Sequence, residues 1–153
     1  MFGIKKGVTA LLKKSHPEIE ITHCLAHRIE LAVKSAVKQV SNKLYDRAMT
    51  LRLGLYYFYK KSSKQKKQLV RTLKICKLPC VLQMRVGGTR WVPHTIAALN
   101  AFFRSYQAIV MQLENASHEN PKAEGLSKMA QDMNIITYLM VLKTVTFQKV
   151  DSP

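Results

Sequence analysis

Apolar side chains recur every three to four residues along most of this chain, and this spacing constrains its fold more than any other feature. Residues at that period share one face of an α-helix, whereas alternate residues share one face of a strand. The pattern predicts helices over residues 7–14, 25–40, 44–60, 64–77, 91–113 and 126–147. Ser41-Asn42 and Ser62-Ser63 fall between neighbouring stretches, and both residue types cap helix N-termini. The chain is therefore expected to be mainly helical.

One short segment departs from the helical period. Ile19 and Ile21 alternate with polar residues, which predicts a strand that runs into Cys24. Glycine and proline predict loops over residues 78–90 and near 115–125, the second around Pro121. The last helical stretch is also rich in β-branched residues, so a strand is the alternative there. We expect an α/β fold that is predominantly helical, with one short strand.

The composition indicates a folded and strongly basic chain. Its 153 residues are 47% apolar, which suits one domain with one hydrophobic core. Lysine and arginine number 25 against 9 aspartate and glutamate, which gives a formal net charge of +16. Such an excess favours polyanionic partners such as nucleic acid or an acidic membrane surface. No apolar run approaches the roughly 20 residues of a membrane-spanning helix, so we expect no membrane insertion.

The positive charge is concentrated in the middle of the sequence, because no acidic residue lies between Asp46 and Glu114. Within this stretch, one narrow stripe of a predicted helix collects four basic residues: Lys64, Lys67, Arg71 and Lys74. Apolar residues 69, 73 and 76 lie on the opposite face. A basic stripe backed by an apolar one suits a helix that follows a phosphate backbone. The alternative is a solvated cationic face that has no dedicated ligand.

Four consecutive aromatic residues, 56–59, precede this basic stripe. Their rings offer surfaces on which nucleobases stack. Aromatic residues at such spacing more often belong to a hydrophobic core, and we expect that role for them.

Three cysteines, Cys24, Cys76 and Cys80, occur without a secretory signal, which predicts free thiols in a reducing compartment. Cys24 and His27 make half of a zinc site, and a structural zinc normally needs four ligands. Cys76 and Cys80 complete a set only if the fold brings them close. We expect instead that Cys24 is buried and that His27 bonds to backbone, so no metal or other cofactor is predicted.

Three segments in this order resemble transposases of the hAT superfamily and genes derived from them. The first is GVTALLKKSHP, from Gly7 to Pro17, followed by the apolar strand. The second is HCLAHRIELAV, from His23 to Val33, which is similar to the family's Cys-x-x-His element and its following helix. The third is YYFYKKSSKQKKQL, followed by TRW at Thr89 to Trp91. The likeness spans roughly residues 1–110.

The resemblance implies a fragment of a ribonuclease-H-like catalytic core over residues 1–40 and a helical insertion over residues 41–153. The family cuts and joins DNA with two aspartates and a glutamate that hold a pair of divalent metals. None of the chain's acidic residues stands at a matching position, so we expect no catalysis. Arg90 and Trp91 match the family's Arg-Trp element, which implies that Trp91 stacks on DNA. The alternative for Trp91 is a core anchor of the following helix.

The basic charge and the resemblance together predict a non-catalytic transposase-derived fragment, either a truncated product or a domesticated one, that binds DNA or RNA weakly and without sequence preference. Such a role suits the nucleus, with the cytoplasm as the alternative. A different class of function stays open. A domesticated fragment can lose its work on DNA and become a scaffold that binds protein partners through exposed apolar surface.

Overall fold

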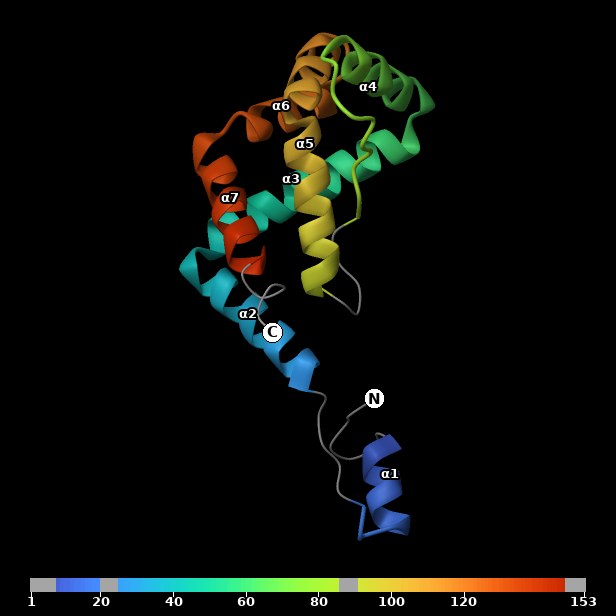
Figure 1. Ribbon diagram of the computed structural model, residues 1–153, viewed down its shortest axis with the longest axis vertical. Helices are drawn as coiled ribbons and strands as arrows, with labels where there is room; N and C mark the ends of the chain where they lie inside the picture. The colour runs from blue at the N-terminus through green and yellow to red at the C-terminus, as the bar shows by residue number, and fades with distance from the viewer. Residues whose placement is uncertain (1–7, 20–24, 86–90, 148–153) are drawn as a thin grey trace.

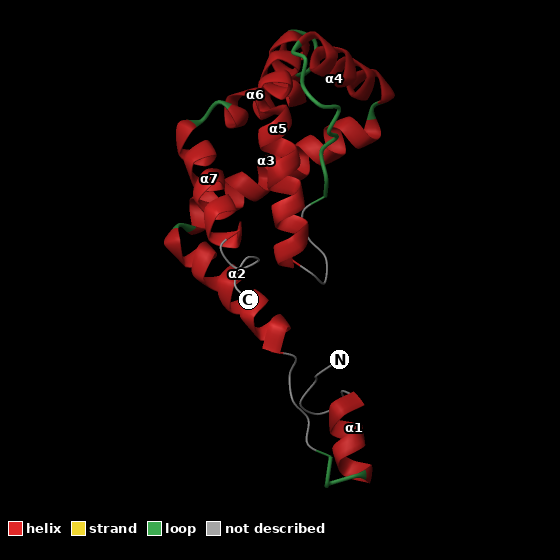
Figure 2. Ribbon diagram, in the orientation of Figure 1, coloured by secondary structure: helices red, strands yellow, loops and turns green. Residues whose placement is uncertain are grey.

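A computed structural model describes residues 8–19, 25–85 and 91–147 of the chain (Figure 1). Every regular element in these ranges is a helix (Figure 2). The helices are α1 (Val8–Ser15), α2 (Leu25–Val40), α3 (Asn42–Lys61), α4 (Ser63–Ile75), α5 (Trp91–Ser117), α6 (Pro121–Ala130) and α7 (Met133–Phe147). Helices α2 to α7 pack together, and α1 lies apart from them in Figure 1.

The predicted α/β fold is wrong, because the described ranges contain helices and no strand. They therefore contain no strand-bearing core of the ribonuclease-H type. Ile19, where the strand was expected to begin, instead follows a turn in which its amide donates to the His16 carbonyl. The rest of the expected strand, residues 20–24, lies outside the described ranges. A single strand of this length needs a neighbouring strand for its backbone hydrogen bonds, and the described residues form none.

The predicted loop near residues 115–125 is much shorter in the structure. Helix α5 continues to Ser117, and α6 already begins at Pro121. The Asn120 side chain accepts hydrogen bonds from the amides of Lys122 and Ala123, at 3.0 and 3.4 Å. Asparagine followed by proline is common in turns, but the same pair caps and opens a helix when these amides are free. The following proline marks a helix start here.

Serine caps fix the boundaries of α3 and α4, the two helices that precede and carry the basic stripe. Ser41 Oγ accepts from the Leu44 amide, and Ser62 Oγ accepts from the Gln65 amide, both at 3.3 Å. Both caps confirm the helix starts predicted from the sequence. Each serine is the single residue that separates two consecutive helices, so α2, α3 and α4 follow one another almost without a loop.

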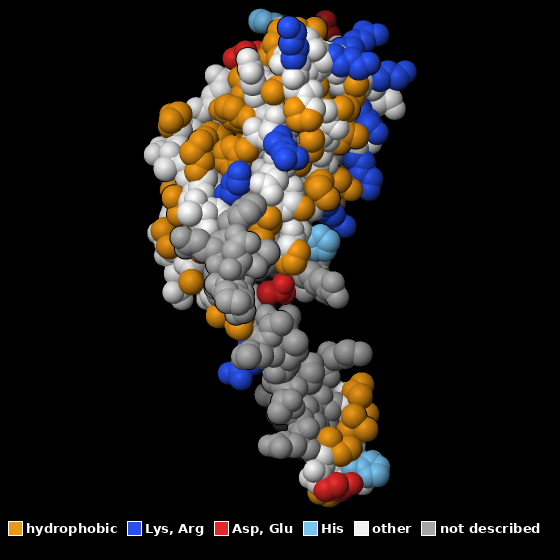
Figure 3. Space-filling model, in the orientation of Figure 1, with side chains coloured by type: hydrophobic (Ala, Val, Ile, Leu, Met, Phe, Trp, Pro, Cys, Tyr) orange, Lys and Arg blue, Asp and Glu red, His pale blue; other side chains and the backbone are white. Residues whose placement is uncertain are grey.

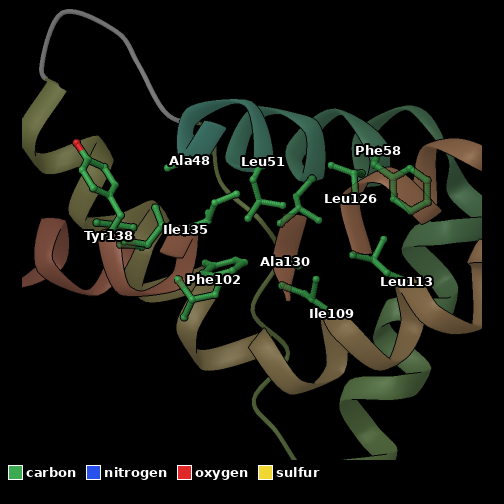
Figure 4. Packing of buried hydrophobic residues seen from close by; sticks show 14 of the residues in the cluster. Ala48, Leu51, Phe58, Phe102, Ile109, Leu113, Leu126, Ala130, Ile135 and Tyr138 are labelled. Atoms are coloured by element: carbon green, nitrogen blue, oxygen red, sulfur yellow. The ribbon is translucent and has the colours of Figure 1, made fainter. Parts of the chain in front are cut away.

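The hydrophobic core lies where α3 crosses α5, α6 and α7 (Figure 4). Its buried side chains come from every helix between α2 and α7. Helices α3 and α6 approach most closely at Gly54, where an added Cβ would lie 2.6 Å from Leu126 Cδ2. An alanine at this position would therefore require the Leu126 side chain to shift. Aromatic residues Phe58 and Tyr59 of α3 are buried in this core, as expected from the sequence, whereas Tyr56 and Tyr57 are only half-buried.

Two buried hydrogen-bond links join helices that are distant in sequence. The Tyr59 hydroxyl donates to Gln112 Oε1 at 2.7 Å, and Gln112 Nε2 donates to Gln65 Oε1 at 2.6 Å. This chain of polar groups ties α3, α5 and α4 together. The Tyr138 hydroxyl of α7 donates to the Val37 carbonyl of α2 at 2.8 Å, which anchors α2 to the other end of the sequence.

One arginine lies inside the core without a hydrogen-bond partner. Arg52 of α3 is 1% exposed, and its Nε, Nη1 and Nη2 atoms all lack a partner. Its guanidinium carbon lies 5.3 Å from the centre of the Phe102 ring. Burial lowers the pKa of Arg52 to about 10, because an apolar surrounding disfavours the charged form.

Candidate nucleic-acid interface

Helix α4 carries the predicted basic stripe on its solvent-facing side. Gln65, Leu69, Thr72 and Leu73 of this helix are buried against the rest of the protein. The four stripe residues, Lys64, Lys67, Arg71 and Lys74, are all exposed. Lysine and arginine side chains accordingly gather along the side of the molecule formed by α4 (Figure 3). The amphipathic pattern therefore places the stripe where it was predicted.

Three hollows follow α4 and share residues where they meet. The first, the tyrosine hollow, has a volume of about 270 Å³ and is lined by Tyr56, Tyr59, Lys60, Lys66, Leu82 and Gln83. The second, the α4 depression, measures about 610 Å³ and is lined by Ser63, Lys66, Lys67, Val70 and Arg71. The third, the glutamine hollow, measures about 170 Å³ and is lined by Gln68, Arg71, Thr72, Gln112, Asn115 and Ala116.

Shared lining residues place these hollows next to one another along α4, and we call this row of three hollows the track. Lys66 belongs to both the tyrosine hollow and the α4 depression, and Arg71 belongs to both the α4 depression and the glutamine hollow. None of the described residues that line the three hollows is acidic. A track with several cations and no carboxylate attracts a polyanion along its whole length.

The far wall of the tyrosine hollow is formed by the chain after α4. Lys77, at φ 53°, reverses the chain: its amide donates to the Lys74 carbonyl and the Leu78 amide to the Leu73 carbonyl. This pair of bonds ends a helix and directs the following residues back along it. Gln83 then fixes the segment to α5, because its Nε2 donates to Ser105 Oγ at 2.8 Å.

Lys60 and Tyr56 form a polar pair at the edge of the same hollow. Lys60 Nζ donates to the Tyr56 hydroxyl at 3.0 Å and lies 5.3 Å from the centre of the ring. Those two distances place the ammonium group beside the hydroxyl end of the ring and not above its middle. The hydrogen bond to Tyr56 raises the pKa of Lys60, so the ammonium stays charged at neutral pH.

Among the described residues, one member of the stripe forms an ion pair with an acidic residue. Lys64 Nζ lies 3.7 Å from Glu119 Oε2, and both side chains are largely exposed. A solvent-exposed pair at that distance contributes little and is screened by salt. The stripe therefore keeps most of its positive charge for a ligand.

The structure brings some of the predicted site residues together and leaves others outside the track. Lys67 and Arg71 line it, whereas Lys64 and Lys74 do not line any of the three hollows. Arg90 and Cys24 lie outside the described residues. Trp91 is the first residue of α5 and His27 lies in α2, but their side chains also fall outside the description. The stacking role of Trp91 stays a prediction.

Two cations of the track, Lys60 and Lys66, were not among the predicted site residues. Lys66 lies at the edge of the helical stripe, and Lys60 lies on a different helix. Tyr56 was considered as a stacking surface but was expected in the core, and it is half-buried. Both lysines lie in the acid-free stretch between Asp46 and Glu114, and this stretch as a whole could have identified them. The prediction considered only residues that share one face of α4. It therefore left out cations that two different helices present to the same hollow.

The described part of the chain holds no group of three or more histidine, cysteine, aspartate or glutamate side chains placed to bind a metal. Cys76 is half-buried and Cys80 is exposed, and neither forms a disulfide. None of the helices in the described ranges is long and apolar enough to cross a membrane.

Comparison with protein-family models, with curated proteins and with solved structures finds no match for this chain.

Proposed function

We propose that this chain is a basic, non-catalytic fragment derived from a hAT-type transposase and that it binds nucleic acid without sequence preference. The observation that carries the proposal is the track along α4, which has cations from end to end and no acidic lining residue. The family origin rests on the sequence resemblance alone.

Binding along this track works through the phosphate backbone. Lys67 is a mobile point charge, and Arg71 has a planar fork that can bind one phosphate through two hydrogen bonds. Asn115 and Gln68 in the glutamine hollow supply amide groups of the kind that contact phosphate and sugar oxygens. Backbone contacts of this type carry no sequence information, so the affinity depends on charge and on salt concentration.

A salt titration of duplex binding tests the proposal. Wild-type chain should bind a short DNA duplex with log K falling linearly against log salt, by about 0.9 for each phosphate neutralised. The double variant Lys67→Gln/Arg71→Gln should lower this slope by up to about 1.8, since two phosphate contacts are lost.

A matched variant separates a defined track from general positive charge. Lys34→Gln/Lys38→Gln removes the same charge from α2, where both lysines are exposed. This control should bind with nearly the wild-type slope. Equal slopes for the two double variants would refute the track, and absence of binding at low salt would refute the function.

The proposed absence of catalysis is tested directly with divalent metal. Purified chain in magnesium or manganese should neither nick DNA nor join strands, because the family's metal-binding carboxylates have no counterpart at matching positions. Metal-dependent cleavage that disappears when one aspartate or glutamate of this chain is replaced would overturn this part of the proposal.

A protein-binding scaffold is the second candidate, and exposed apolar residues of α7 favour it. Met133, Met140, Val141 and Val145 of this helix are 72%, 53%, 54% and 40% exposed. Exposed apolar side chains on one helix suit contact with another protein. If the chain fails to bind nucleic acid at low salt, this scaffold role becomes the favoured function.

A further inference from the structure

We propose that the tyrosine hollow holds one unpaired nucleobase of a single-stranded nucleic acid, with the neighbouring phosphates bound by Lys60 and Lys66. This inference rests on the proposed nucleic-acid binding and adds a preference for single strands over duplex. A base inside a duplex is stacked and paired, so it cannot enter a side hollow.

The size and lining of the hollow fit one base. Its volume of about 270 Å³ lies below the range of roughly 300–1,000 Å³ that is typical for drug-sized ligands. Tyr56 and Leu82 give it apolar walls, and both are half-buried. The Lys60 ammonium lies beside the Tyr56 hydroxyl and does not cover the middle of the ring, and the Tyr57 ring packs edge-on against Tyr56 with 5.1 Å between the ring centres. A base would stack on the part of the Tyr56 ring that neither contact covers. Every base has a π-face, so such a site accepts all four.

The cations of the hollow lie where a bound nucleotide needs them. Lys60 comes from α3 and Lys66 from α4, so two helices present positive charge to one opening. Lys66 also lines the α4 depression, beside Lys67 and Arg71. A strand with one base in the hollow can therefore lay its next phosphates along α4.

The walls are held in place before any ligand binds. Tyr59 at the back of the hollow is fixed by its bond to Gln112, and Gln112 is bonded to Gln65 of α4. Gln83 on the far wall is bonded to Ser105 of α5. A site with walls that are already ordered loses less entropy on binding.

The neighbouring residues provide an internal control. Tyr57 is half-buried like Tyr56, and Lys61 Nζ lies 5.6 Å from the centre of its ring. The Tyr57–Lys61 pair has the same residue types one position further along α3, and the Tyr57 ring packs edge-on against the Tyr56 ring with 5.1 Å between the ring centres. Neither Tyr57 nor Lys61 lines the hollow. The two tyrosines differ in position and not in chemistry.

The test measures fluorescence anisotropy with a labelled oligothymidine strand, the corresponding oligouridine strand and a DNA duplex, using the whole chain. Tyr56→Leu should weaken binding to both single strands about tenfold more than it weakens duplex binding, because only the single strands lose a stacked base. Tyr57→Leu should keep the wild-type preference for single strands. Tyr56→Phe keeps the ring and should keep the preference for single strands.

A strand of abasic sites removes the base without changing the protein. Wild-type chain should bind it about as weakly as Tyr56→Leu binds oligothymidine. Equal binding of the abasic strand, oligothymidine and polyglutamate would overturn the inference and leave only a polyanion track. Equal losses for Tyr56→Leu and Tyr57→Leu would also overturn it. If wild type binds neither strand nor duplex, the proposed function itself fails.

Discussion

Replacement of the buried Arg52 by methionine should make this protein more stable. The guanidinium is 1% exposed and none of its nitrogens has a hydrogen-bond partner. Burial lowers the pKa of Arg52 to about 10, and a lowering of that size corresponds to roughly 3 kcal/mol against the charged folded state. The contact with the Phe102 ring, worth up to about 2 kcal/mol when desolvated, is lost in the variant.

The expected net gain from Arg52→Met is about 1–3 kcal/mol, since methionine fills similar space without a charge to desolvate. For a chain of this size that corresponds to a rise in melting temperature of roughly 3–9 °C. The way in which this destabilisation by Arg52 changes with pH follows from the lowered pKa. The folded state binds the proton less tightly than the unfolded state, so the penalty is complete at neutral pH and declines above about pH 10.

Thermal and urea unfolding followed by circular dichroism measure the effect. Arg47→Met is the control on the same helix, because Arg47 is half-exposed and pairs with Asp132 at 2.8 Å. It should change the melting temperature little. If Arg52→Met unfolds several degrees below wild type, the reasoning is wrong. The guanidinium must then be paired in solution, and a phosphate titration of the wild-type melting temperature would identify a bound anion.

Other variants test the packing around the core. Gly125→Ala should stabilise by about 0.5–1 kcal/mol through helix propensity, because nothing lies within 4 Å of the added carbon. Gly54→Ala should instead destabilise by about 1–3 kcal/mol, since the added carbon meets buried Leu126; equal melting temperatures for the two would contradict this packing. Tyr59→Phe should cost about 1–3 kcal/mol at pH 7 by leaving Gln112 without its donor. Burial raises the pKa of Tyr59, so the stability of the wild-type protein should fall above about pH 10, and that of the variant should fall less. Parallel curves of stability against pH for the two proteins above about pH 10 would argue against this.

The helices of α2 to α5 were predictable from local features of the sequence. Apolar periodicity located them, and the hydroxyl groups of Ser41 and Ser62 set where α3 and α4 begin. The start of α6 could not be predicted from local features, because Asn120-Pro121 is compatible with both a turn and a helix cap. Helix α7 is apolar on all sides, so its period could not separate a helix from a strand.

The candidate site was predictable only in part for a related reason. The stripe on α4 depends on one helix and its period, and the sequence contains that information. The tyrosine hollow depends on Tyr56 and Lys60 of α3 meeting Gln83 across a tertiary contact, which no local pattern encodes. Nothing in the sequence distinguishes Arg52 from the other basic residues of the acid-free stretch, because its burial is decided by the packing of α5 against α3.

The bond from the Tyr138 hydroxyl to the Val37 carbonyl has a consequence for the order in which the chain folds during synthesis. The two residues are separated by 101 positions, so α2 leaves the ribosome long before its anchor is made. Closing a loop of that length costs roughly 4 kcal/mol of chain entropy unless the intervening helices have already folded. We therefore expect α3 to α6 to assemble first on the nascent chain. Until α7 emerges, α2 remains without this anchor, and that interval is when its apolar residues are most open to chaperones or to aggregation.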